Sequence, residues 1–240
     1  MERLQKVIAN YGYASRREAE KLITNKKVYV NNRLITELGT KVSGDDTITI
    51  NGVVINNQNT KKYYLLNKPR SVISTAHDDL GRITVVDLIN TNHRIYPIGR
   101  LDYDTTGLIL LTNDGDFANY LMHPKNEISK TYVAKVEGLL QKDAIDSLKH
   151  GVIINDRKVN IKNFKVRKKD FEKNTCLIEI TISEGRNHIV KKVFEKLGYP
   201  VIKLTRTKYA DLSLGKLQSG EYRELTIKEV KTLYKDKQNL

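Results

Sequence analysis

The stretch GRLDYDTTGLILLTNDGD, residues 99–116, places Arg100, Asp102 and Asp104 directly before a long apolar run. A carboxylate held on a rigid edge beside a cation can act as a nucleophile at a sugar carbon. Two neighbouring carboxylates can instead hold a metal ion or share the work of glycoside hydrolysis. The structural alternative is that these Asp residues shape a turn by bonding to nearby backbone N–H groups.

The spacing of the two carboxylates favours one reactive group over a pair. If residues 102 and 104 belong to the strand that the apolar run predicts, their side chains point to opposite faces. A shared site for Asp102 and Asp104 is therefore disfavoured, and a hydrolase lacks a second suitably placed carboxylate. What remains is a lone carboxylate, which can still act as a nucleophile at a sugar carbon.

Several other chemistries find no support in the sequence. The chain has no G-x-x-x-x-G-K-[ST] or G-x-G-x-x-G motif for nucleotides, and no G-x-S-x-G nucleophile elbow. Its one cysteine, Cys176, and its five scattered histidines provide neither a disulfide framework nor metal-ligand spacing. We therefore expect no cofactor and no metal.

The charge of the chain points to a polyanionic partner. Lys and Arg number 42 against 28 Asp and Glu, a net charge of +14. Residues 1–60 carry 9 basic and 6 acidic side chains, so most of the surplus lies in residues 61–240. Because neutralising phosphates releases counterions, this surplus favours nucleic acid over a membrane surface or a basic protein with no such partner.

The chain shows no export or membrane signal. Its start, MERLQKVIAN, is charged and lacks the apolar segment of a signal peptide. No run approaches the roughly 18 apolar residues that span a bilayer. We expect a cytoplasmic protein, a monomer, with no membrane partner.

The first 60 residues predict a small basic module. Apolar residues at positions 4, 7, 8 and 11 predict a helix that Gly12 ends, and Ser15 with Glu18 forms a capping box that opens a second helix. Short hairpins follow about Asn31-Asn32 and Asn51-Gly52. Arg16 and Arg17 lie at the start of the second helix, where the helix dipole repels cations. Phosphate binding would explain that cost, and a solvated helix face is the alternative.

A polar linker, NNQNTKK at 56–62, predicts the start of a second domain, 61–240. Strands are predicted in KKYYLLNKPRSVIST (broken at Lys68-Pro69), GLILLTNDGD (ending in a turn), KTYVAKVEG and NTCLIEITISEGRNH. Helices are predicted in LLQKDAIDSLKHG, NHIVKKVFEKLG and LTIKEVKTLYK, and the terminal KDKQNL is expected to fray. Without a repeating β-α-β rhythm, this order predicts an α+β fold with a largely antiparallel mixed sheet and flanking helices.

These residues match a known family along most of the chain. RLQKVIANYGYASRREAEKLI resembles the S4 RNA-binding module, a small α/β domain. NKPRSVIST, YPIGRLDYDTTGLILLTNDGDFANYLMHP, KTYVAKVEG and EGRNHIVKKVF resemble successive catalytic motifs of the RsuA/RluB ribosomal RNA pseudouridine synthases. The stretches DFANYLMHP and VIKLTRTKYADL are most similar to the RluB branch, which acts on large-subunit rRNA. The RsuA branch, which acts on small-subunit rRNA, is the second choice.

The resemblance implies a reaction and a set of residues. The family isomerises uridine to pseudouridine without a cofactor, with Asp102 in the position of the nucleophile and Arg100 helping to extrude the uridine. The sequence leaves open whether the Asp attacks C1′ or assists elimination to a glycal. Tyr132 matches the active-site tyrosine, and Lys191 occupies the place of the basic partner of the Asp. The resemblance and the charge pattern together imply a set of basic residues that bind RNA: Arg3, Lys6, Arg16, Arg17, Lys21, Lys26, Lys27, Lys68, Arg186 and Lys192.

The chain departs from the family pattern at a few positions. Ile189 stands where Gln is common, Lys191 and Lys192 where Arg is common, and Ser71 where Gly is usual. Lysine keeps the charge but cannot form the bidentate fork of arginine. Two other functions stay open: a catalytically silent rRNA-binding assembly factor, which only Ile189 supports, and a hydrolase that cleaves the glycosidic bond and releases free uracil.

Overall fold

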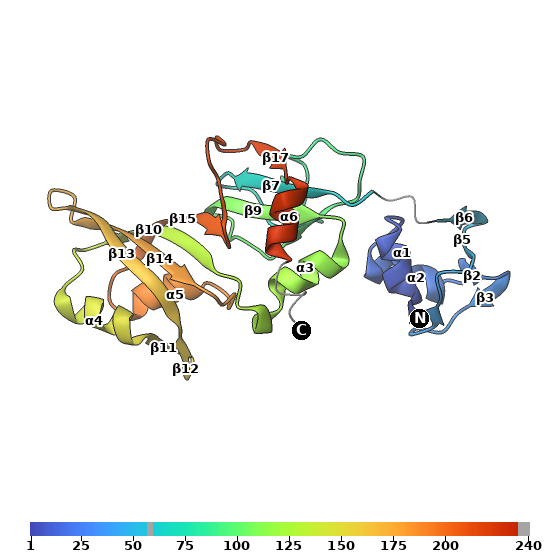
Figure 1. The fold of residues 1–240 in the computed structure, drawn as a ribbon, viewed down its shortest axis with the longest axis horizontal. Coiled ribbons are helices and arrows are strands. Elements are labelled where there is room, and N and C mark those ends of the chain that lie inside the picture. Colours follow the sequence, from blue (N-terminus) through green and yellow to red (C-terminus); the bar gives the residue numbers. More distant parts are fainter. Residues whose placement is uncertain (57–59, 235–240) are drawn as a thin grey trace. The chain divides into compact units, whose positions relative to one another are not determined.

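The computed structural model describes residues 1–56 and 60–234, which divide into two compact units (Figure 1). The first unit comprises residues 1–62 with the segments Thr91–Ile95 and Asn113–Gly115, and the second comprises the rest. The middle of the predicted linker, 57–59, and the predicted frayed end, 235–240, lie outside the described residues. No helix of the described part is long and apolar enough to cross a membrane.

The first unit follows the sequence pattern closely. Both predicted helices form, and the Ser15–Glu18 capping box is confirmed, with Glu18 N–H donating to Ser15 Oγ at 3.1 Å. The two hairpins are confirmed, with positive φ at both central residues of each turn. The elements of this unit are β1 (Glu2–Arg3), α1 (Leu4–Asn10), α2 (Arg16–Thr24), β2 (Val28–Val30), β3 (Arg33–Ile35), β4 (Lys41–Val42), β5 (Ile48–Ile50) and β6 (Val53–Ile55).

The second unit is built on a mixed, mostly antiparallel sheet of nine strands, which confirms the predicted fold class. The main path runs β13-β14-β10-β15-β9-β7-β17, with β16 on β15 and β8 on β9, and β11 and β12 form a separate hairpin. The strands are β7 (Tyr63–Lys68), β8 (Tyr96–Ile98), β9 (Thr106–Thr112), β10 (Lys130–Glu137), β11 (Val152–Ile154), β12 (Arg157–Val159), β13 (Ile161–Asp170), β14 (Thr175–Ile182), β15 (Val201–Tyr209), β16 (Leu212–Ser213) and β17 (Tyr222–Glu224).

Helices pack against this sheet. The three predicted helices are confirmed, including the Thr226–Glu229 capping box. A further α-helix, α3, begins at Gly115, where the sequence analysis predicted only a turn, and it buries Phe117 and Leu121 against β7 and β9. The helical segments are α3 (Gly115–Met122), η1 (Pro124–Asn126), α4 (Lys142–His150), α5 (Ile189–Lys196) and α6 (Ile227–Leu233).

A short parallel seam joins the two halves of the sheet. Strands β9 and β15 pair in parallel at two positions only, Thr106 with Thr205 and Gly107 with Arg206. Gly107 has φ +105°, and an added Cβ would lie 2.2 Å from the backbone oxygen of Arg206. The close approach of β9 and β15 therefore requires glycine at this position.

We expect Gly107→Ala to lower the free energy of unfolding by about 2–4 kcal/mol, since the added methyl group forces the seam apart at a strained φ. Urea denaturation followed by circular dichroism would measure the change. Gly185→Ala is the control, because an added Cβ there meets nothing within 4 Å and its φ is not positive. A variant as stable as the wild type would show that the seam does not need glycine.

Candidate active site

Asp102 lies in the loop between β8 and β9, four residues before the strand begins. Thr105 N–H donates to the Asp102 carbonyl at 3.1 Å and closes a turn over 102–105. The alternation of a strand therefore does not apply here. The prediction that Asp102 and Asp104 point to opposite faces is wrong, because the turn brings both carboxylates to one side.

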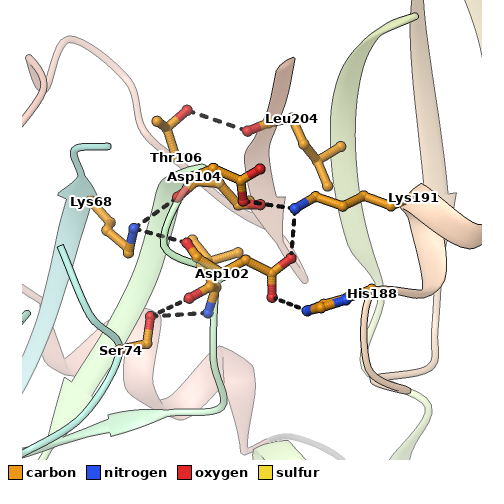
Figure 2. Close-up of polar contacts among 10 residues, drawn as sticks. Lys68, Ser74, Asp102, Asp104, Thr106, His188, Lys191 and Leu204 are labelled. Atoms are coloured by element: carbon orange, nitrogen blue, oxygen red, sulfur yellow. Dashed lines mark hydrogen bonds and ion pairs between the residues drawn. The ribbon is translucent and has the colours of Figure 1, made fainter. Parts of the chain in front are cut away.

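Lys191 of α5 joins the two carboxylates (Figure 2). Its Nζ lies 3.1 Å from Asp102 Oδ2 and 2.7 Å from Asp104 Oδ1. Burial opposes the charge of Lys191, but its bonds to Asp104 and Asp102 outweigh this and raise the pKa of the ammonium. The bond from Lys191 also lowers the pKa of Asp104. These shifts favour the charged forms of Lys191 and Asp104.

His188 supplies a second contact to Asp102 that the sequence analysis missed. Its Nε2 lies 3.2 Å from Asp102 Oδ1, so each oxygen of this carboxylate has a different partner (Figure 2). His188 is the N-cap of α5, in a left-handed conformation with φ 54°. The sequence held one sign of this contact: His188 lies three residues before Lys191 at the start of a predicted helix. Residues at i and i+3 share a helix face, so both side chains could be expected to reach the same carboxylate.

The loop that carries Asp102 is anchored from beneath by Lys68. This side chain is 0% exposed, and its ammonium donates to the carbonyls of Pro69, Asp102 and Thr105 at 3.1, 3.1 and 2.9 Å. The prediction that Lys68 binds RNA is wrong, because a fully buried ammonium with three backbone acceptors cannot reach a phosphate. Burial lowers the pKa of Lys68 to about 8, against the opposing attraction of Asp104 and Asp102.

Ser74 fixes the same loop one residue earlier. Its hydroxyl donates to the Leu101 carbonyl at 2.7 Å and accepts from the Leu101 N–H at 3.1 Å. Ser71, which stands where the family usually has glycine, has a positive φ of 63°, and its N–H donates to the Tyr103 carbonyl. The position of Asp102 is therefore set by the backbone around it.

A cavity of about 700 Å³ opens beside Asp102. This volume is typical of a small-molecule or nucleotide site. Three other predicted residues line it: Arg100, which is exposed, Tyr132, which is 8% exposed, and Arg186. Ile189, which replaces the usual amide, is buried in the same wall. No group of three potential metal ligands occurs among the residues that the structure describes.

The structure places the predicted RNA-binding residues in different settings. Arg186 pairs with Glu184 and donates to the Ile154 carbonyl at 2.9 Å, and Lys6 pairs with Glu2 at 2.7 Å. Lys192 is half-buried on α5. The remaining predicted residues are exposed on the first unit: Arg3, Arg16, Arg17, Lys21, Lys26 and Lys27.

The fold and the site define a class of RNA-modifying enzyme. Residues 62–196 match the RNA pseudouridylate synthase family, and residues 2–48 match the S4 domain. The chain belongs to the RNA pseudouridylate synthase family and is therefore an isomerase of uridine in RNA.

Individual relatives cover nearly the whole chain. It is 54% identical to ribosomal large subunit pseudouridine synthase B of Bacillus subtilis (strain 168), over 97% of this chain and 96% of that protein. It is 35% identical to the dual-specificity RNA pseudouridine synthase RluF of Escherichia coli (strain K12), over 97% and 78%. A crystal structure of a pseudouridylate synthase aligns with a TM-score of 0.67 and 30% identity, covering 97% of this chain and 100% of that one.

The buried ammonium of Lys68 predicts a pH dependence of stability. The unfolded pKa is near 10.5 and the folded value about 8, so between these values the unfolded chain holds a proton that the native protein has lost. The free energy of unfolding should therefore rise with pH in this window, by at most about 3 kcal/mol from this group.

Lys68→Met should remove this contribution. We expect a flatter dependence of unfolding free energy on pH between 8 and 10, measured by urea denaturation at several pH values. Lys142→Met, at an exposed position of α4, should follow the wild-type slope. Equal slopes for Lys68→Met and the wild type would contradict the assignment.

Proposed function

We propose that the protein converts a specific uridine of large-subunit ribosomal RNA to pseudouridine, with Asp102 as the nucleophile. The observation that carries the proposal is the Asp102 carboxylate in the cavity wall, with one oxygen 3.1 Å from Lys191 and the other 3.2 Å from His188. A carboxylate oriented in this way can attack a sugar carbon.

The proposed chemistry needs no other reactant. An oxygen of Asp102 attacks C1′, and the bond from C1′ to N1 breaks with its electron pair left on the uracil. The uracil rotates, C5 attacks C1′, and Asp102 leaves. The proton lost from C5 is balanced by the one gained at N1, so the product is an isomer of the substrate.

The surrounding residues suit a base that has left its stack. Extrusion costs a few kcal/mol, and Arg100, exposed at the cavity, can offset it through phosphate contacts or by filling the space that the base leaves. Tyr132 can stack on the uracil from the cavity wall. Lys191 attracts Asp102 and Asp104 together, which keeps a cation beside the attacking oxygen.

The assignment of large-subunit rRNA rests on the relatives. The name of the B. subtilis relative specifies the large ribosomal subunit, and the similarity extends over both units. The exposed cations of the S4 unit suit structured RNA, whose helices are read mainly through shape and phosphates. The target is accordingly an unpaired uridine, and the two units divide the work between holding RNA and isomerising it.

Asp102→Asn should abolish tritium release from C5-labelled large-subunit rRNA, a loss of at least about 10³-fold, because an amide cannot act as the nucleophile. Asp104→Asn is the matched control, since it contacts the same ammonium but has no role in bond formation. We expect it to retain activity within about 30-fold. Full release by Asp102→Asn would overturn the nucleophile assignment.

The same assay separates the alternatives. Small-subunit rRNA and ribosomal precursor particles serve as parallel substrates, and release from small-subunit rRNA alone would overturn the large-subunit assignment. Free uracil in the products would indicate a hydrolase. Absence of release from every substrate would favour a silent RNA-binding assembly factor.

The S4 unit predicts a separable effect on binding. Arg16→Ala/Arg17→Ala should weaken RNA binding and reduce the slope of log affinity against log salt by about 2, while the single-turnover rate at saturating RNA stays nearly unchanged. Filter binding across a salt series measures this. Arg33→Ala/Lys41→Ala removes two exposed charges from the same unit as a control, and an equal slope in both double variants would defeat the assignment.

A further inference from the structure

Four side chains form one wall of the cavity, on two neighbouring strands. Lys130 and Tyr132 lie two residues apart on β10 and so share a face of the sheet. On β15, Tyr209 is the register partner of Lys130, and Arg206 is the partner of Tyr132. All four line the cavity that contains Asp102, and we call them the β10–β15 wall.

The wall holds two cations around one neutral ring. The Arg206 guanidinium and the Lys130 ammonium each lie 5.3 Å from the centre of the Tyr209 ring. The Tyr209 hydroxyl donates to the Leu121 carbonyl at 3.0 Å, and burial raises its pKa to about 12, so the ring stays neutral. This geometry fixes the relative positions of the two cations.

Neither cation of the wall has a carboxylate within ion-pair distance in the described part of the chain. Arg206 is 2% exposed, donates from Nε to the Leu108 carbonyl at 2.7 Å, and leaves its buried Nη2 without a hydrogen-bond partner among the described residues. Lys130 donates to the Ile128 carbonyl at 3.0 Å, and no described carboxylate forms an ion pair with either cation. Burial, reinforced by the charge of Arg206, lowers the pKa of Lys130 to about 8.

Such an arrangement is costly unless it serves a ligand. A buried charge or unpaired donor destabilises the folded protein, so native structures seldom keep one without a role. Here the buried cations and the unpaired donor lie in the wall of the reaction cavity, beside Tyr132, which can stack on the base. The missing partner is an electron-rich group that enters the cavity.

We infer that Lys130 donates a hydrogen bond to a carbonyl oxygen of the flipped uracil and stabilises the negative charge that the ring carries once it leaves C1′. Arg206 is a positioning residue, because it lies against the same Tyr209 ring as Lys130 and so helps to hold the Lys130 ammonium in place. The inference rests on the proposed function and assigns Lys130 a catalytic role within it.

The charge balance of the reaction supports a ring anion as the ligand. When the bond between N1 and C1′ breaks, its electron pair stays on the uracil and spreads over N1 and the two carbonyl oxygens. The charge disappears when C5 bonds to C1′, loses its proton, and N1 is protonated. A fixed donor aimed at a developing oxyanion in a water-poor site accelerates such a step.

The wall suits a uracil better than a phosphate. A planar ring can pack against the aromatic ring of Tyr132 beside Lys130, whereas a phosphate needs no aromatic surface and can be bound by the exposed Arg100.

Lys130→Met tests the inference. With the rRNA substrate and the modified uridine mapped for the wild type, we expect the single-turnover rate to fall about 100-fold while the RNA dissociation constant stays within threefold. Lys130→Arg should recover part of the rate. Lys135→Met is the matched control, because Lys135 lies on the same strand but faces the other side of the sheet and does not line the cavity; it should stay within threefold in both measurements.

A second measurement uses the wild-type protein and does not depend on the variants folding. Sulfur accepts hydrogen bonds more weakly than oxygen. Two RNAs are compared with the unmodified substrate, one with 2-thiouridine and one with 4-thiouridine at the mapped position. The RNA in which sulfur replaces the oxygen that Lys130 contacts should react at least tenfold more slowly. Unchanged rates with both thio-substituted RNAs would overturn the inference.

The outcomes separate this inference from the proposed function. If the wild type releases tritium and Lys130→Met, shown to be folded by circular dichroism, reacts within threefold of it, Lys130 has no catalytic role and the proposed function stands. A loss that appears only as weaker RNA binding would also overturn the inference. If the wild type releases no tritium from any rRNA, both fail together.

Discussion

The ammonium of Lys191 lies between two carboxylates, and the site depends on that placement. Its bonds to Asp102 and Asp104 join the start of α5 to a loop 87 residues earlier in the chain. Without this cation, two carboxylates would face each other at a partly buried position, where like charges repel strongly. The same contacts bring His188 to the second oxygen of Asp102, so one helix end sets both sides of the carboxylate.

Local signals made much of the fold predictable. The two capping boxes and the two tight hairpins follow from residue types at fixed spacings, and the structure has them where expected. The family motifs also indicated Asp102, Tyr132 and Lys191 as members of one site; Asp102 and Tyr132 line one cavity, and Lys191 contacts Asp102. Such features depend on neighbours in sequence, which a single chain reveals.

The features that escaped prediction depend on partners distant in sequence. Lys68 is the last residue of β7 and precedes a proline, and these neighbours give no sign that its ammonium is buried, because two of its three acceptors come from residues 34 and 37 positions later. Predicting that Asp104 and Asp102 lie on the same side required knowing that β9 begins only at Thr106. In a strand their side chains would point to opposite faces, whereas the turn that they form brings them together. The placement of Arg206, with its Nη2 unpartnered among the described residues, depends on the register of β10 with β15, which no local pattern encodes.

The seam between β9 and β15 also bears on how the protein is made. Strand β9 is apolar and buried along nearly its whole length, yet its partner at Thr205 is synthesised 99 residues after Thr106. At about 5–20 residues per second, the Thr106–Gly107 end of this strand lacks its partner on one edge for about 5–20 s while translation proceeds, although β8 can already pair with residues 110–112 of that edge. Exposed apolar edges promote aggregation, so the emerging chain has a period of vulnerability that ends only when its last long strand leaves the ribosome.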